Sequence, residues 1–112
     1  MDIRFHDHEA SRQAALCMHA RQRLQHRLAH RSERIHHVEV RLGGTGSRRG
    51  HQDIYCLMRL QTVGAPATTV VDIGTDAFDT IDRAADRVAR MADEQLRLAD
   101  RDSAKHGKEK LR

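Results

Sequence analysis

Alternation of apolar and polar residues predicts four strands along the chain. Residues 35–42 and 53–62 place an apolar side chain at every second position, which is typical of strands with one buried face. Residues 2–6 and 67–73 show the same period over shorter lengths, and we expect Val71 and Ile73 to point into the core. A glycine-rich loop at 43–50 and a turn at 63–66, which contains glycine and proline, separate the last three strands.

Two longer stretches repeat apolar residues every three or four positions, which is the period of an amphipathic helix. The first covers residues 9–31 and contains neither glycine nor proline. The second starts at a cap formed by Thr75 or Asp76 and runs to about residue 100, with Phe78 and Ile81 on its core-facing side. The polar segment 101–112 is predicted to be a flexible basic tail.

The order β-α-β-β-β-α predicts an α+β fold within one domain, residues 1–100. A length of 112 residues suits a single domain. The short connections between the last three strands imply antiparallel neighbours. Each predicted helix has one apolar face, so we expect two long helices to pack on one face of a four-stranded sheet.

Positive charge is concentrated in the first half of the chain. Residues 1–60 hold 11 Lys+Arg against 6 Asp+Glu, whereas residues 61–112 hold 9 against 10. All basic residues before Lys105 are arginines, which donate two hydrogen bonds to one phosphate in a way that lysine cannot. This distribution, with a pI of about 9.7, indicates a surface that faces a polyanion.

The first predicted helix carries the clearest signal for RNA binding. No acidic residue occurs between Ala10 and Ser32, so the arginines spaced four residues apart on its polar side are predicted to form an uncompensated positive ridge. An ordinary solvated face and a membrane-binding face are the alternatives, and the helix lacks the aromatic residues typical of the latter. The candidate contacts to RNA on the ridge are Arg21, Arg23, Arg27, Arg31 and Arg34.

The loop and the second helix supply further candidates for RNA contacts. Arg48 and Arg49 lie in the glycine-rich loop, and Arg83, Arg87 and Arg90 lie on the second predicted helix. Because acids stand four residues before Arg83, Arg90 and Arg97, these arginines are expected to pair within their own helix. Arg87 has no such acid and is therefore expected to be the most available.

The chain has only three aromatic residues of the Phe, Tyr and Trp types: Phe5, Tyr55 and Phe78. Modules that read unstacked bases need aromatic platforms, and we expect Phe5 and Phe78 to be buried. Recognition is therefore predicted to depend on RNA shape and phosphates.

No arrangement of residues indicates catalysis. We find no nucleophile–base pattern and no metal-ligand spacing, so we expect no enzyme activity, metal, cofactor or small-molecule substrate.

No apolar run is long enough to span a membrane, and no export signal precedes the first strand, which predicts a cytoplasmic protein. Cys17 and Cys56 are expected to be reduced and inert.

Residues 71–90 resemble the ribosome hibernation-promoting factor and ribosome-associated inhibitor family, also described as sigma-54 modulation proteins. In that family the last strand leads into a helix with an Asp-x-aromatic-x-x-Ile-Asp pattern followed by basic residues. The matching positions here are Asp76, Phe78, Ile81, Asp82, Asp86, Arg87 and Arg90.

The resemblance implies two parallel helices on a four-stranded sheet and a short-form factor. Such a factor would bind rRNA of the small ribosomal subunit where mRNA and tRNA otherwise lie, and would inhibit translation under stress. It assigns rRNA contacts to Arg87 and Arg90 and, on the first helix, to Arg23 and Arg27. The family's basic run further along the second helix is replaced here by residues 91–95, which include Asp93 and Glu94.

A second reading of the sequence is a non-catalytic regulatory module that binds another protein. The exposed face of the sheet, with Tyr55, Leu57 and Arg59, would then be the interaction surface.

Overall fold

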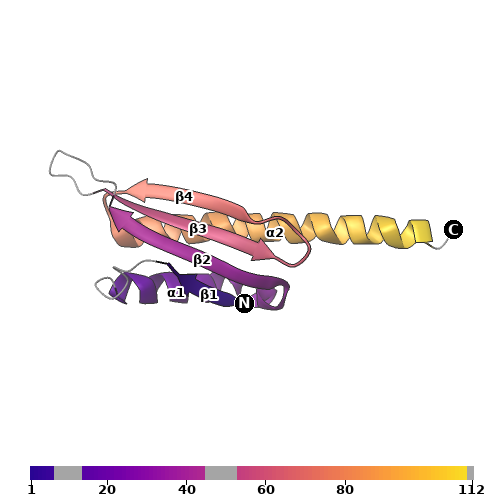
Figure 1. Ribbon diagram of the computed structural model, residues 1–112, viewed down its shortest axis with the longest axis horizontal. Coiled ribbons are helices and arrows are strands. Elements are labelled where there is room, and N and C mark those ends of the chain that lie inside the picture. The colour runs from indigo at the N-terminus through magenta and orange to yellow at the C-terminus, as the bar shows by residue number, and fades with distance from the viewer. Residues whose placement is uncertain (7–13, 45–52, 111–112) are drawn as a thin grey trace.

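The computed structural model describes residues 1–6, 14–44 and 53–110 of the chain, with side chains described as far as residue 102. The predicted order of elements is confirmed, with a short 3₁₀ helix, η2, added between the first helix and the second strand (Figure 1). The elements are β1 (Asp2–Phe5), α1 (Ala14–Leu28), η2 (Ala29–Arg34), β2 (Ile35–Gly44), β3 (Ile54–Thr62), β4 (Thr68–Gly74) and α2 (Ala77–Lys110).

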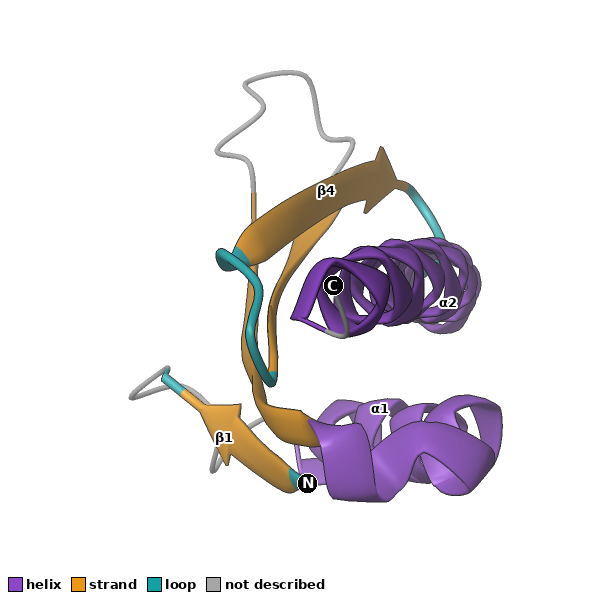
Figure 2. Ribbon diagram, turned by 90° about the vertical axis from the view of Figure 1, so that its right-hand side faces the viewer, coloured by secondary structure: helices purple, strands orange, loops and turns teal. Residues whose placement is uncertain are grey.

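The four strands form one mixed sheet in the order β1-β2-β3-β4. β1 pairs with β2 in parallel, and the other two pairings are antiparallel, as the short connections predict. Both helices lie on one face of the sheet, and the other face is open (Figure 2). The α+β fold expected from the sequence is therefore confirmed.

The core lies between the sheet and the two helices. The inward side chains of β2 and β3, which include Val38, Val40, Met58 and Leu60, are at most 1% exposed. α1 contributes only a narrow stripe, Ala20, Leu24 and Leu28, spaced four residues apart. α2 contributes a broader face that includes small residues, so its backbone can approach the sheet closely. The buried α2 residues are Thr80, Ile81, Ala84, Ala85, Val88, Ala92 and Leu96.

The predicted orientation of β4 is wrong by one residue. Val70 is buried, whereas Val71 and Ile73 are 44% and 58% exposed on the open face. A one-residue shift moves every side chain of a strand to the opposite face. Asp72 takes the helix side instead because Arg83 and Arg87 of α2 reach it there.

The exposure of Phe78 and the end of α2 also differ from the prediction. Phe78 is 47% exposed, and it meets His19 edge-on with ring centroids 4.9 Å apart. α2 continues to Lys110, beyond the predicted end near residue 100. The predicted start of the first helix at residues 9–13 lies outside the described residues.

A buried polar contact ties the β3–β4 turn to α2. The hydroxyl of Thr62, which is fully buried, donates a 3.0 Å hydrogen bond to the side-chain oxygen of Gln95. The amide of Gln95 in turn donates to the hydroxyl of Thr68. The hydroxyl of the buried Thr62 is thereby satisfied, and the two hydrogen bonds link α2 to the ends of β3 and β4.

We expect Leu24→Ala to lower the free energy of unfolding by about 2–5 kcal/mol, because it leaves a cavity under the narrow stripe of α1. Met18 of the same helix is 61% exposed, so Met18→Ala is the matched control and should change stability little. Urea denaturation of both variants measures the difference. Equal losses would show that α1 is not anchored through Leu24.

Candidate nucleic-acid interface

A row of ion pairs joins the basic side of α1 and η2 to acidic residues of α2. Arg31 donates a 2.7 Å hydrogen bond to Asp93, and Arg34 donates two hydrogen bonds to Asp100, the shorter of which is 2.7 Å. The partners advance together along both segments, so α1 and α2 run parallel. We call this set the interhelical row: Arg23–Asp82, Arg27–Asp86, Arg31–Asp93 and Arg34–Asp100.

The predicted uncompensated ridge is therefore wrong. Four of its five arginines face carboxylates from elsewhere in the same molecule. Two histidines join the same carboxylates: His19 lies 2.7 Å from Asp82, and His30 lies 3.9 Å from Asp93. The repulsion along α1 is relieved within the fold, so it does not by itself require a nucleic acid.

The predicted pairs between residues four apart within α2 are also wrong. Asp86 and Asp93 face α1, so they are not the partners of Arg90 and Arg97. Arg97 instead pairs with Glu94, three residues earlier, at 2.8 Å. The sequence suggested local pairs because four-residue spacing is visible in it, whereas contacts across about sixty residues are not.

Arg83 and Arg87 hold the free edge of β4. Arg87 donates a 2.9 Å hydrogen bond to the carbonyl of Val71 and a 3.2 Å hydrogen bond to Asp72. Arg83 reaches the carbonyl of Ile73 at 3.4 Å. These guanidinium groups satisfy part of an edge that would otherwise present unpaired carbonyls. Arg87, expected to be the most available arginine of its helix, is thus engaged within the fold.

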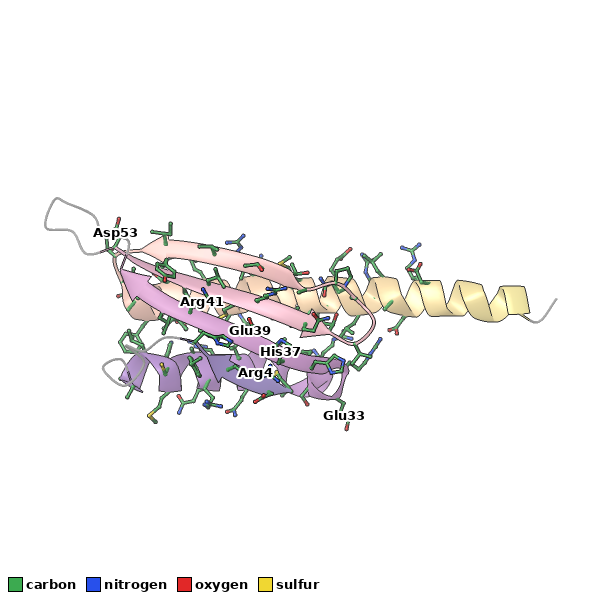
Figure 3. All side chains as sticks on the ribbon, in the orientation of Figure 1. Arg4, Glu33, His37, Glu39, Arg41 and Asp53 are labelled. Carbon is green, nitrogen blue, oxygen red and sulfur yellow. The ribbon has the colours of Figure 1, made fainter. Side chains whose placement is uncertain are left out.

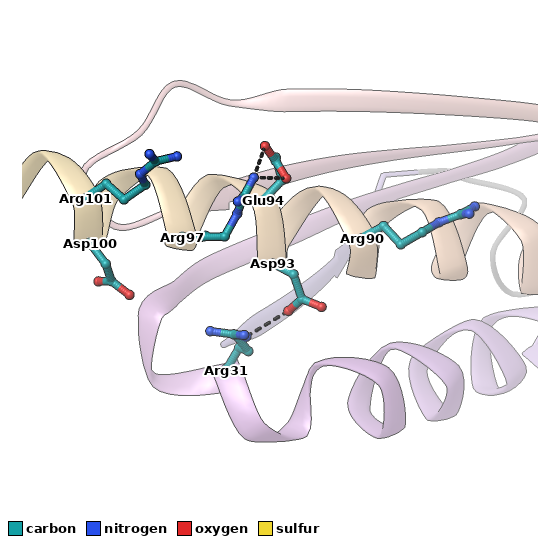
Figure 4. Close-up of a pocket in the computed structure, with 7 residues that line it drawn as sticks. All are labelled: Arg31, Arg90, Asp93, Glu94, Arg97, Asp100 and Arg101. Atoms are coloured by element: carbon teal, nitrogen blue, oxygen red, sulfur yellow. Dashed lines mark hydrogen bonds and ion pairs between the residues drawn. The ribbon is translucent and has the colours of Figure 1, made fainter.

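Arg90 is the best-placed free cation between the two helices. It lines two adjacent hollows, of about 360 and 660 Å³, and among the described residues it has no ion-pair partner. The larger hollow is shown in Figure 4, where Arg31 and Asp93 point toward each other and Arg90 lies apart from both. The lining of the larger hollow is Arg31, Arg90, Asp93, Glu94, Arg97, Asp100 and Arg101.

The remaining candidate arginines divide into two groups. Arg21 is exposed on α1, and its guanidinium carbon lies 5.3 Å from the ring centre of Phe5, a cation–π distance. Arg48 and Arg49 lie outside the described residues, so their role in RNA binding stays a prediction.

The part of the chain with described side chains is electrically balanced. Residues 1–6, 14–44 and 53–102 hold 13 Lys+Arg and 13 Asp+Glu. The net charge of +4 therefore comes from the other segments, of which 45–52 carries +2, 103–112 carries +3 and 7–13 carries −1. A polyanion would meet excess positive charge mainly from residues 45–52 and 103–112.

Two pKa shifts have clear causes. The hydrogen bond from Arg34 holds the pKa of Asp100 below its ordinary value of 3.8. Burial raises the pKa of the Cys56 thiol to about 12, which keeps it protonated and unreactive. Neither group supplies an acid or base that would titrate near neutral pH.

Among the described residues, no group of three or more metal-ligating side chains comes together. None of the helices in this part of the chain has the length and apolar character needed to cross a membrane.

Comparisons with known proteins bear on the fold. No protein-family model matches the chain, and no curated protein matches it. Among solved structures it is similar to the N-terminal domain of Protein Y from Thermus thermophilus, with 17% sequence identity and a TM-score of 0.62. The match covers 82% of this chain and 96% of that domain. The similarity shows a shared fold over nearly all of the Protein Y domain.

The Arg34–Asp100 pair should make stability depend on pH in the acid range. Because the folded-state pKa of Asp100 is depressed, its contribution is present above the unfolded pKa near 3.8 and is lost as pH falls through the folded pKa. Asp100→Asn should therefore be less stable than the native chain at about pH 7, and the difference should shrink as pH falls below 3.8 and through the folded-state pKa of Asp100.

Urea unfolding across this pH range measures the effect, with Asp102→Asn as the control. Asp102 is exposed and forms no ion pair among the described residues. A stability difference between Asp100→Asn and the native chain that stays constant with pH would contradict the assignment.

Proposed function

We propose that the chain is a non-catalytic factor that binds the small ribosomal subunit and inhibits translation by occupying the channel for mRNA and tRNA. One observation carries the proposal. The resemblance of residues 71–90 to the hibernation-factor family implies two parallel helices on a four-stranded sheet, and this arrangement is the one observed. The fold shared with the Protein Y domain supports the same conclusion.

In this proposal, the side of the molecule formed by α1, η2 and α2 faces rRNA. Arg90 contributes a guanidinium that is free of ion pairs among the described residues, next to Arg27, His30 and Arg31. The arginines of the interhelical row retain donors, because each guanidinium has five and the acids use only part of them. Phosphates compete with carboxylates there, so binding depends on RNA shape and charge.

The other candidate arginines have different places in the proposal. Arg48 and Arg49, together with the basic residues of 103–112, supply the net positive charge that attracts the ribosome over distance. Arg21, Arg23 and Arg34 remain candidate contacts. Arg83 and Arg87 are the weakest candidates, because their donors already bind β4 and Asp72. The factor would act in the cytoplasm during stress.

Arg90→Gln should weaken binding to isolated small ribosomal subunits more than Arg59→Gln does. Both arginines are exposed and have no ion-pair partner among the described residues, but Arg59 lies on the open sheet face. Losing one phosphate contact should reduce the dependence of log affinity on log salt concentration by about 1. Co-sedimentation with the subunits at low and high salt measures both effects.

Two results would contradict this assignment. If the native chain does not co-sediment with small subunits at low salt, the proposed function is wrong. If Arg59→Gln weakens binding as much as Arg90→Gln, the helix side is not the interface. Inhibition of translation in a purified system, relieved by excess mRNA and tRNA, tests the steric mechanism separately.

Asp86→Asn should tighten binding to the small subunit, because it frees Arg27 and removes a carboxylate that repels phosphate. Asp79→Asn makes the same charge change on α2 at a residue with no described ion pair, so it is the matched control. The expected gain is severalfold at low salt and should shrink as salt rises. Equal effects of the two changes would indicate that only net charge matters.

A further inference from the structure

The open face of the sheet carries four apolar side chains that the core does not use. Tyr55 and Leu57 of β3 lie in register with Ile73 and Val71 of β4, respectively. Val71 and Ile73 are 44% and 58% exposed, and Tyr55 and Leu57 are partly exposed. We call this group the apolar patch. Adjacent exposed apolar side chains of this kind mark an interaction surface more often than isolated ones do.

The apolar patch has a fixed shape. The ring of Tyr55 lies across Gly43 on β2, where an added Cβ would come within 2.8 Å of the ring atoms. The absence of a side chain at Gly43 therefore lets the hydroxyl end of the ring approach β2 this closely. A ring held in this way offers contact area at little cost in side-chain entropy.

The border of the apolar patch toward β1 and β2 is charged (Figure 3). Arg4 pairs with Asp2 at 2.8 Å, and Glu39 lies 3.5 Å from His37. Arg41 faces Leu57 across the strands and has no ion-pair partner among the described residues.

Two more charged residues, Arg59 and Asp53, lie beside the apolar patch and show which of its sides is basic. Arg59, between Glu39 and Thr69 in the register, is also without a described ion pair. Asp53 lies at the opposite end of the patch, before β3 begins. A bound group would therefore meet free positive charge on the Arg41–Arg59 side of the apolar patch.

The size of the apolar patch and the covered edge of β4 restrict the kind of partner that can bind. The patch is two strands wide and two outward positions long, roughly 5 by 7 Å between side-chain positions, which suits two or three apolar side chains. A stable interface between two copies needs about 1,000 Å² or more. One aromatic ring among four residues does not make a platform for RNA bases. Arg83 and Arg87 cover carbonyls of the β4 edge, so an added strand would have to displace them.

We infer that the apolar patch binds a short segment of another protein in which two or three apolar residues stand next to acidic residues. The apolar side chains pack on Tyr55, Leu57, Val71 and Ile73, and the acidic residues face Arg41 and Arg59. This surface lies on the opposite side of the sheet from the helices and does not depend on the proposed binding to RNA.

Two synthetic peptides test the inference. One contains a Leu-x-Leu segment followed by glutamates, and the other has lysines in place of the glutamates. NMR titration of the full isotopically labelled chain should show binding of the glutamate peptide, with shifts concentrated at the apolar patch and at Arg41. The lysine peptide should bind at least about tenfold more weakly at low salt.

Variants separate the apolar from the charged contribution. Ile73→Thr should weaken the glutamate peptide about tenfold. Val63→Thr is the matched control, because Val63 is 47% exposed and lies in the turn beyond β3. Arg41→Glu combined with Arg59→Glu should reverse the preference toward the lysine peptide. These positions are exposed or on the open face, and thermal unfolding of each variant checks that it folds.

Three results would overturn the inference. The first is equal or absent binding of the two peptides. The second is concentration-dependent self-association in sedimentation that Ile73→Thr abolishes, which would make a second copy the occupant. The third is a preference of the patch for single-stranded RNA over both peptides. Ribosome binding by Ile73→Thr, measured in parallel, reports on the proposed function alone.

Discussion

The arrangement of the helices depends on how the arginines of α1 and η2 meet the aspartates of α2. α1 fully buries Ala20, Leu24 and Leu28, and Leu16 and Cys17 pack against the core in part, so hydrophobic burial alone gives it a narrow attachment. Each exposed ion pair contributes little on its own, because water and salt screen it. Together they fix the register between two parallel helices, and they consume the charge that would otherwise repel within α1. The interhelical row therefore positions α1 against α2, and it is also the reason that the helix side is nearly neutral.

Much of the fold could be predicted from the sequence because strand and helix periods are local. The inward residues of β2 and β3, such as Val40 and Met58, follow from simple alternation. β4 could not be oriented in this way, since both of its faces carry β-branched residues. Its orientation depends on Asp72, which meets Arg83 and Arg87 only after α2 has packed on the sheet.

The candidate site was harder to predict than the fold, because an ion pair across two helices leaves no spacing signal in the chain. The aspartates of α2 suited local pairing equally well, so Asp86 and Asp93 were assigned to the wrong arginines. Arg90 stood among several equivalent candidates in the sequence. Only the packing of the helices shows that its neighbours are paired and that, among the described residues, it is not. Arg48 and Arg49 remain predictions from composition.

The length of α2 carries its last residues well beyond the sheet (Figure 1). Among the side chains that the structure describes, Leu96 is the last buried one of this helix, and the helix from there to Lys110 spans about 20 Å. Residues 103–110, at the projecting end, include three lysines and one glutamate. The span exceeds twice the Debye length of about 8 Å at physiological salt. The charge at this end is therefore largely screened from the balanced body, and a polyanion can attract it before the helix side comes into contact.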